Sequence, residues 1–192
     1  SGATGNVFNG GLRGTGDLTL AAARVSPSTY SDFIVDLSSD PSATLRIGHA
    51  EGEEALGPQL SAGGKLEFKA ANIEHSGLIS APLGQVLFSA PGGSVTLGDT
   101  SVTSVAGVTT TPLGQTSQSG RVWEFNASGL NPEDGALLSL LISITAPEKS
   151  VRIDADNSLV ETGATIDLSG GGEAVAWEFS PGPGGKTDVL AW

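Results

Sequence analysis

The sequence has 192 residues, among them 28 Gly and 10 Pro, and it contains neither Cys nor Met. This length is enough for one domain with a sizeable core, and the lack of Cys excludes disulfides, thiol catalysis and Cys-based zinc sites. The sequence contains 9 basic and 21 acidic residues, so its net charge is −12. This negative charge argues against nucleic acids and anionic membrane surfaces as partners.

Short strands dominate the pattern along the chain, and we expect almost no helix. Polar and apolar residues alternate strictly in several short runs, which is typical of strands with one buried face. These runs are 17–20, 43–47, 65–69, 94–97 and 150–154. Gly-Gly, Gly-Asp, Asp-Asn and Pro-Gly pairs separate the runs and predict tight corners between strands.

Part of the sequence returns after 20 residues. The segment GKLEFKA (64–70) is followed by GQVLFSA (84–90), and GDLTLAA (16–22) is a more distant copy. About 20 residues with short strands and glycine corners make one coil of a parallel β-solenoid, in which neighbouring coils lie ~4.8 Å apart. A β-sandwich is the alternative, but it would contain similar strands without this return.

Two ranges interrupt the period, 26–58 and 108–148, and we expect both to leave the stack as loops or as a small extra sheet. Long departures from a regular fold frequently carry binding sites. The second range contains the apolar run 136–144, which is too short to span a bilayer, so no membrane insertion is expected. An acidic, Pro-containing segment before this run would suit a helix start, whereas its β-branched end and Pro147 favour a buried strand.

Several Gly-rich segments follow one another in a distinctive order. They are LSAGGKL (60–66), IEHSG (73–77), APLGQ (81–85), GATIDLSGGG (163–172), EFSPGPGG (178–185) and DVL (188–190). In these segments the sequence resembles the filamentous haemagglutinin family, large exoproteins that Gram-negative bacteria export by two-partner secretion. The resemblance covers most of the chain and is least clear over 26–58 and 108–148.

This resemblance implies a fold, a location and partners. Members of the family are long right-handed parallel β-helices at the cell surface or in the medium; many are adhesins, and others carry a C-terminal toxin domain. Residues 1–192 would form a single β-helix segment, a fragment of the shaft of a larger secreted exoprotein. The implied partners are a host-surface glycan or receptor and, during export, an outer-membrane transporter. The lack of Cys fits passage through the periplasm in an unfolded state.

No motif in the sequence points to catalysis, a metal or a cofactor. There is no Gly-x-Ser-x-Gly elbow and no His-Glu-x-x-His helix, and we expect His75 at an outward or corner position. Asp154, Asp156 and Asp167 are the candidates for a polysaccharide-active β-helix enzyme, since glycoside hydrolysis uses paired carboxylates. The same acids would also suit Ca²⁺. The simpler interpretation is that they cap Gly-rich corners, and we assign no catalytic residue, metal or cofactor.

The best candidate for ligand binding is Trp123, in the second long range. Sugar rings stack on exposed aromatic side chains, and the neighbouring Arg121 and Glu124 would hydrogen-bond the hydroxyl groups. The alternative is that Trp123 and Phe125, which share strand parity, pack this range onto the coils. We therefore predict a structural and adhesive segment rather than an enzyme. A passive spacer of a toxin-delivery exoprotein and, less favoured, a polysaccharide-active enzyme are the alternatives.

Overall fold

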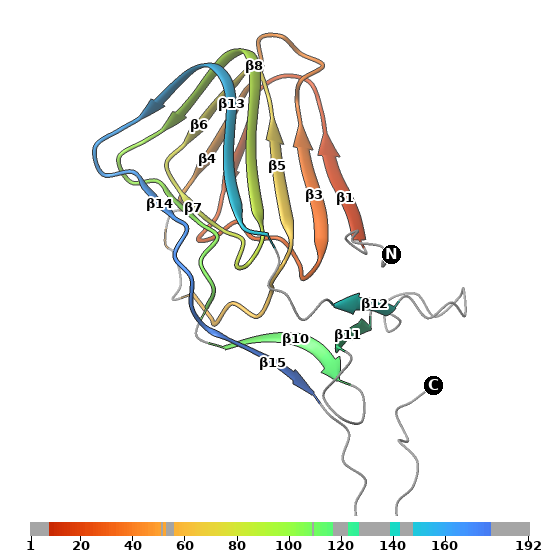
Figure 1. Ribbon diagram of the computed structural model, residues 1–192. Coiled ribbons are helices and arrows are strands. Elements are labelled where there is room, and N and C mark those ends of the chain that lie inside the picture. Colours follow the sequence, from red (N-terminus) through yellow and green to blue (C-terminus); the bar gives the residue numbers. More distant parts are fainter. Residues whose placement is uncertain are drawn as a thin grey trace, which may run out of the picture.

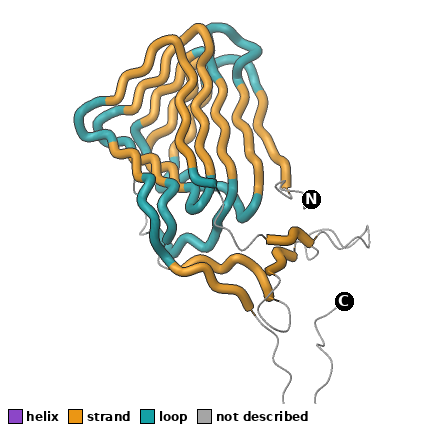
Figure 2. Tube along the Cα trace, viewed as in Figure 1, coloured by secondary structure: helices purple, strands orange, loops and turns teal. Residues whose placement is uncertain are grey.

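The computed structural model describes residues 8–50, 52, 56–108, 110–116, 123–126, 139–142 and 148–177. All regular secondary structure in these ranges is β-strand, and they contain no helix (Figure 2). This part of the chain accordingly has no helix with the length and apolar character needed to cross a membrane. The all-β prediction is confirmed for these residues.

The strands divide into a curled stack and a smaller sheet, which is drawn below the stack in Figure 1. The stack contains β1 (Phe8–Arg13), β2 (Leu18–Ala21), β3 (Ser31–Asp36), β4 (Thr44–Gly48), β5 (Lys65–Lys69), β6 (Asn72–His75), β7 (Leu78–Ser80), β8 (Gln85–Leu97), β9 (Val102–Ser104), β13 (Ser150–Val160) and β14 (Thr165–Asp167). The smaller sheet contains β10 (Thr110–Thr116), β11 (Trp123–Asn126), β12 (Ser139–Ile142) and β15 (Glu173–Trp177).

The strand pairs described in the stack are all parallel, and they form three faces. β1, β3, β5 and the first halves of β8 and β13 make the first face. β2, β4, β6 and the second halves of β8 and β13 make the second face, and β7, β9 and β14 make the third. The chain thus returns repeatedly to lie beside its own earlier strands, which is consistent with a β-helix or solenoid.

The predicted 20-residue return corresponds to one pair of stacked strands. Lys65 pairs with Gln85 and Phe68 with Phe88, so the two repeated segments lie side by side in register. The two phenylalanine rings stack, with centroids 5.6 Å apart and planes inclined by 19°. Paired residues are further apart in the sequence elsewhere in the stack. On its other side, for example, Gln85 pairs with Ser150.

The expectation that 26–58 leaves the stack is wrong for two strands in that range. β3 pairs with β1 on one side and β5 on the other, and β4 pairs likewise with β2 and β6. Their inward side chains join the core, where Val35 and Ile47 are at most 4% exposed. The additional length lies between β3 and β4 and between β4 and β5, because coils lengthen at their corners without losing strand register.

Within 108–148 the described strands belong to the smaller sheet, whose order is β12-β11-β10-β15. β10, β11 and β12 are antiparallel neighbours, whereas β10 and β15 are parallel. β10 follows β9 along the chain and β15 follows β14, so this sheet continues from the third face (Figure 1). β12 lies inside the apolar run 136–144, so the strand interpretation of that run is confirmed for residues 139–142.

The core lies inside the curl and is built from alternate residues of the stacked strands. Leu66, Phe68, Val86 and Phe88 are at most 3% exposed, while the residues between them are half-buried on the outer side. Fully burying one large apolar side chain contributes roughly 1.5–3 kcal/mol. The alternation that identified the strands is therefore also the main source of their stability.

Glycine at the corner before β8 permits the close approach of two coils. A Cβ on Gly84 would overlap the carbonyl oxygen of Gly64. The amide of Gln85 donates a hydrogen bond to that same carbonyl at 3.0 Å. The recurrence of Gly at these two corners thus has a steric reason.

Candidate functional site

The structure places two of the three predicted ligand-binding residues in the smaller sheet. Trp123 and Glu124 are the first two residues of β11. Trp123 lies opposite Thr116 of β10 and Ile142 of β12 in the strand register. Arg121 lies outside the described residues. Trp123 and Glu124 therefore occupy the central strand of the three antiparallel strands, in a sheet separate from the parallel stack.

Asp154 and Asp156, two of the acids considered for a polysaccharide-active site, have separate partners. The carboxylate of Asp154 lies 3.7 Å from Nη2 of Arg152 on the first face. Asp156 falls at a register shift of β13 and accepts a hydrogen bond from the Gly92 amide at 3.1 Å. Asp156 thus ties the bend of β13 to the bend of β8, which is a structural contact.

Asp167, the third of these acids, ends β14 on the third face. Its carboxylate accepts a hydrogen bond from the Ser169 amide at 2.9 Å, and hydrogen bonding by Ser169 lowers the pKa of Asp167. The same Asp-x-Ser turn occurs at Asp36 and Asp40, and in both cases the serine two residues further on lowers the pKa of the carboxyl. Asp167 is therefore a turn residue, in a turn type that recurs in this chain.

His75 lies in the core, and the predicted outward or corner position is wrong. It is 1% exposed, its ring stacks on Phe88 with centroids 5.9 Å apart, and its Nε2 donates to the Val102 carbonyl at 3.4 Å. Burial lowers the pKa of His75 to about 4, so the imidazole is neutral at pH 7. The signal for burial was in the sequence, because Ile73 and His75 share the inward parity of β6.

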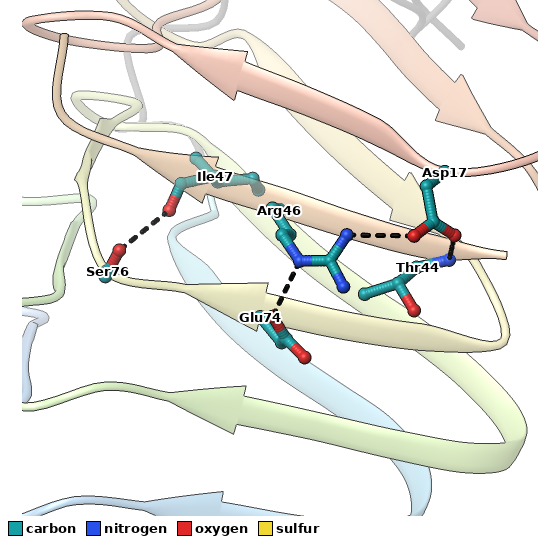
Figure 3. Close-up of polar contacts among 6 residues, drawn as sticks. All are labelled: Asp17, Thr44, Arg46, Ile47, Glu74 and Ser76. Carbon is teal, nitrogen blue, oxygen red and sulfur yellow. Dashed lines mark hydrogen bonds and ion pairs between the residues drawn. The ribbon is translucent and has the colours of Figure 1, made fainter.

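Arg46 connects neighbouring strands on the outer surface of the second face (Figure 3). Its Nη1 lies 2.9 Å from Oδ2 of Asp17, just before β2, and its Nε lies 3.0 Å from Oε2 of Glu74 on β6. Asp17 also accepts a hydrogen bond from the Thr44 amide at 2.9 Å. The Arg46 guanidinium holds the pKa of Asp17 below its usual value. The cluster pairs its charges internally and links successive strands of the stack.

Opposite charges also pair on the outer surface of the first face. Glu67 of β5 lies between Lys65 and Lys69, at 3.4 and 2.9 Å from their ammonium groups. Burial raises the pKa of Glu67, but the two lysines outweigh it, and the pKa is lowered overall. On the neighbouring strands, Arg13 lies 3.8 Å from Asp36. Surface pairs of this kind contribute about 0–1 kcal/mol each.

A cavity of about 950 Å³ opens at the β1 end of the stack. It is lined mainly by apolar groups, among them Leu12, Leu20, Val25, Phe33 and the buried Phe68. Here the interior of the coil is not covered by a further described strand. Within the described ranges, no group of three or more His, Asp or Glu side chains is arranged to hold a metal ion.

No protein-family model, curated protein or solved structure matches the chain. The resemblance to filamentous haemagglutinin therefore stays a prediction from the sequence motifs. The polar clusters of the stack link one strand to the next, whereas the smaller sheet carries the predicted ligand residues Trp123 and Glu124. That sheet is the candidate binding region.

Proposed function

We propose that the chain is a structural and adhesive segment of a secreted bacterial surface exoprotein of the filamentous haemagglutinin kind. In this proposal the stack is a right-handed parallel β-helix with coils of about 20 residues and longer insertions, and the chain is not an enzyme. The smaller sheet presents Trp123 and its neighbours to a host-surface glycan or receptor. Export of the parent protein through an outer-membrane transporter belongs to the same proposal.

The observation that carries the proposal is the continuous parallel ladder β1-β3-β5-β8-β13. Backbone hydrogen bonds run from strand to strand along the whole ladder, and the apolar core continues beneath it. Each coil contacts mainly its neighbours, so such a structure extends in one direction as a stiff rod. A stiff rod that holds a side sheet away from the cell is suited to attachment.

The candidate contact surface rests on a different feature, the antiparallel addition formed by β10, β11 and β12. It departs from the repeat and holds Trp123 on its central strand, where backbone pairing on both sides fixes the position of the residue. Tryptophan offers a flat apolar face and one N–H donor, which matches the C–H face and hydroxyl groups of a sugar ring.

The experiment is a glycan array probed with the labelled chain and with Trp123→Ala. We expect binding to a restricted set of glycans and at least about a tenfold loss for Trp123→Ala, the loss that follows from removing ~1.4 kcal/mol of contact energy. Trp177→Ala, on the far strand β15 of the same sheet, is the matched control and should retain binding. Far-UV circular dichroism establishes that both variants keep the sheet.

Two results would contradict the adhesive part of the proposal. Absence of binding on glycan and host-cell arrays at high concentration would favour a passive spacer. Equal losses for Trp123→Ala and Trp177→Ala, with circular dichroism unchanged, would remove the special role of Trp123. A crystal structure with a two-sheet sandwich, in place of stacked parallel coils, would overturn the structural part.

A further inference from the structure

We propose that a buried polar corner of the stack binds one water molecule, which joins the side chains of His75, Ser101 and Thr103. The corner lies between the second and third faces, where β6 ends and β9 begins. β6 has described strands on both sides, and so has β9. The inference therefore does not depend on what lies beyond either end of the stack, nor on the proposed adhesive function.

Each of the three side chains has a buried polar atom without a partner. His75 and Ser101 are 1% exposed, and Thr103 is 0% exposed. Within the described part of the chain, no hydrogen bond is formed by Nδ1 of His75, Oγ of Ser101 or Oγ1 of Thr103. A buried polar atom without a hydrogen bond destabilises the folded state, and such atoms are rare in native proteins. Three of them at one corner point to a shared partner.

The hydrogen bond of His75 places these atoms near one another. Nε2 of its ring lies 3.4 Å from the carbonyl oxygen of Val102, the residue between Ser101 and Thr103. Val102 is half-buried on the outer side. Ser101 and Thr103 alternate with it, and their burial shows that they point inward. The ring of His75 thus reaches the stretch of backbone from which both hydroxyl groups project into the interior.

The same hydrogen bond determines which nitrogen of His75 carries the hydrogen. A carbonyl oxygen only accepts, so Nε2 must donate. The lowered pKa of His75 keeps its ring neutral at pH 7, and Nδ1 of this neutral ring is an acceptor that needs a donor. Neither hydroxyl group forms a hydrogen bond with it. A water molecule can donate to Nδ1 and also bond both hydroxyl groups, which gives the three hydrogen bonds usual for buried water.

The residues stacked on Ser101 are small. Continuing the register of β7, β9 and β14 by one residue puts Gly77 on one side of Ser101 and Ala164 on the other. The backbone agrees with this register, because the amide of Val102 donates to the Gly77 carbonyl at 2.9 Å. A hydrogen atom and a methyl group fill much less space than the Val, Leu and Ile side chains of the other inward columns. We therefore expect space beside Ser101 for a molecule of the size of water.

Water fits this corner better than an ion or an organic ligand. None of the three side chains is charged at pH 7, and a buried ion without an opposite charge is strongly destabilised. Within the described ranges, no group of three or more His, Asp or Glu side chains is arranged to hold a metal ion. Because the three residues are at most 1% exposed, the corner is closed to solvent, which suits a buried water molecule.

Thr103→Val tests the proposal through the sign of its effect, because a methyl group of similar size replaces the hydroxyl group. Loss of a hydroxyl that bonds the water should raise the equilibrium constant of unfolding about tenfold in urea titrations, which corresponds to ~1.4 kcal/mol. Ser101→Ala should act in the same direction. Thr96→Val, at a half-buried outer position of the same coil, is the matched control and should change the constant at most about twofold. An unchanged or lower constant for Thr103→Val would overturn the proposal, since replacing an unsatisfied buried hydroxyl by a methyl group does not destabilise the fold.

Two measurements on the unaltered chain do not rely on the folding of a variant. Long-range proton–nitrogen correlation by nuclear magnetic resonance should find the ring hydrogen of His75 on Nε2. A high-resolution crystal structure should show a water oxygen about 3 Å from Nδ1 and within hydrogen-bond distance of the hydroxyl group of Ser101 or Thr103. A ring hydrogen on Nδ1, a direct hydrogen bond from a hydroxyl group to Nδ1, or a corner without this water would each overturn the proposal.

Discussion

β8 and β13 lie side by side in the stack and have similar sequence patterns, yet their inward side chains differ in burial. Both alternate apolar and polar residues, and Val86 and Phe88 of β8 are opposite Val151 and Ile153 of β13. The two β8 residues are at most 1% exposed, whereas their β13 partners are only partly buried. Among the described strands, β8 has neighbours on both sides and β13 on one. Alternation thus tells which side chains point inward, and the second neighbouring strand completes their burial.

The largest expected effect of a single substitution separates these two strands. Phe88→Ala removes a fully buried ring that contacts Phe68 and His75, and should lower the free energy of unfolding by about 3–5 kcal/mol. Ile153→Ala, in the same column at the end of the stack, should cost roughly 1–2 kcal/mol, because part of its surface is already in water. Urea unfolding of the two variants measures both. Equal losses would mean that β13 is as well covered as β8.

The middle of the stack should also be sensitive to pH through His75. Its pKa is lowered to about 4 in the folded protein, against about 6.5 in an unfolded chain. The unfolded state therefore binds the proton first, and stability falls as the pH drops from 6.5 towards 4. The full effect is on the order of 3 kcal/mol. Below this window the turn and cluster carboxylates with lowered pKa values, such as Asp36 and Asp167, add their own loss.

Urea unfolding at pH 7 and pH 4.5 measures this dependence. His75→Leu keeps a similar side-chain volume without a titrating group, so the variant should lose much less stability between the two values. His49→Gln, at an exposed histidine, is the control and should behave like the parent. An unchanged pH dependence in His75→Leu would show that other groups dominate in this window.

Corner glycines provide a backbone test of coil packing. Gly84→Ala would force a methyl group against the Gly64 carbonyl, and we expect a loss of about 1–3 kcal/mol from overpacking. Gly57→Ala meets nothing within 4 Å and should leave stability unchanged or slightly raised. Thermal unfolding of the two variants decides. If Gly84→Ala is tolerated as well as Gly57→Ala, the corners at Gly84 and Gly64 are not in close contact.

The smallest effect is expected at the outer surface. Arg46→Met keeps the apolar stem of the side chain and removes the ion pairs with Asp17 and Glu74. Because these groups are about half exposed, water and salt screen their interaction. The melting temperature should fall less than for Phe88→Ala, Ile153→Ala or Gly84→Ala, and the difference should vanish at high salt. A large loss that persists in salt would give the cluster a stronger structural role.

The register of β5 against β8 was predictable from the sequence, and the places of β3 and β4 in the stack were not. The copies at 64–70 and 84–90 match residue for residue at Gly, Phe and Ala, so their pairing follows directly. The sequence predicts that β3 and β4 leave the stack, because longer corners conceal their place in the coil. Val35, for example, lies in a run of alternating polar and apolar residues, as a strand requires. Its partner Phe68 on the neighbouring strand, however, lies 33 residues further along the chain and not 20.

Side-chain surroundings were harder to predict than strands. Residue type alone predicts an outward position for His75, whereas its parity with Ile73 indicates the interior. The core accepts this histidine because Phe88 and the Val102 carbonyl provide a stacking and a hydrogen-bonding partner. The sequence places Trp123 in a range that interrupts the repeat. Its antiparallel pairing with Thr116 and Ile142 depends on contacts between distant segments that periodicity does not reveal.

The parallel pairing of β5 with β8 underlies the whole stack, and nuclear Overhauser contacts in solution would detect it. We expect contacts between the rings of Phe68 and Phe88, and no close Hα–Hα pairs between the two strands. Close Hα–Hα approach belongs to antiparallel pairs, in which opposed Cα atoms come as near as ~4.5 Å. Strong Hα–Hα contacts between β5 and β8, or rings that are not in contact, would contradict the stacked-coil structure.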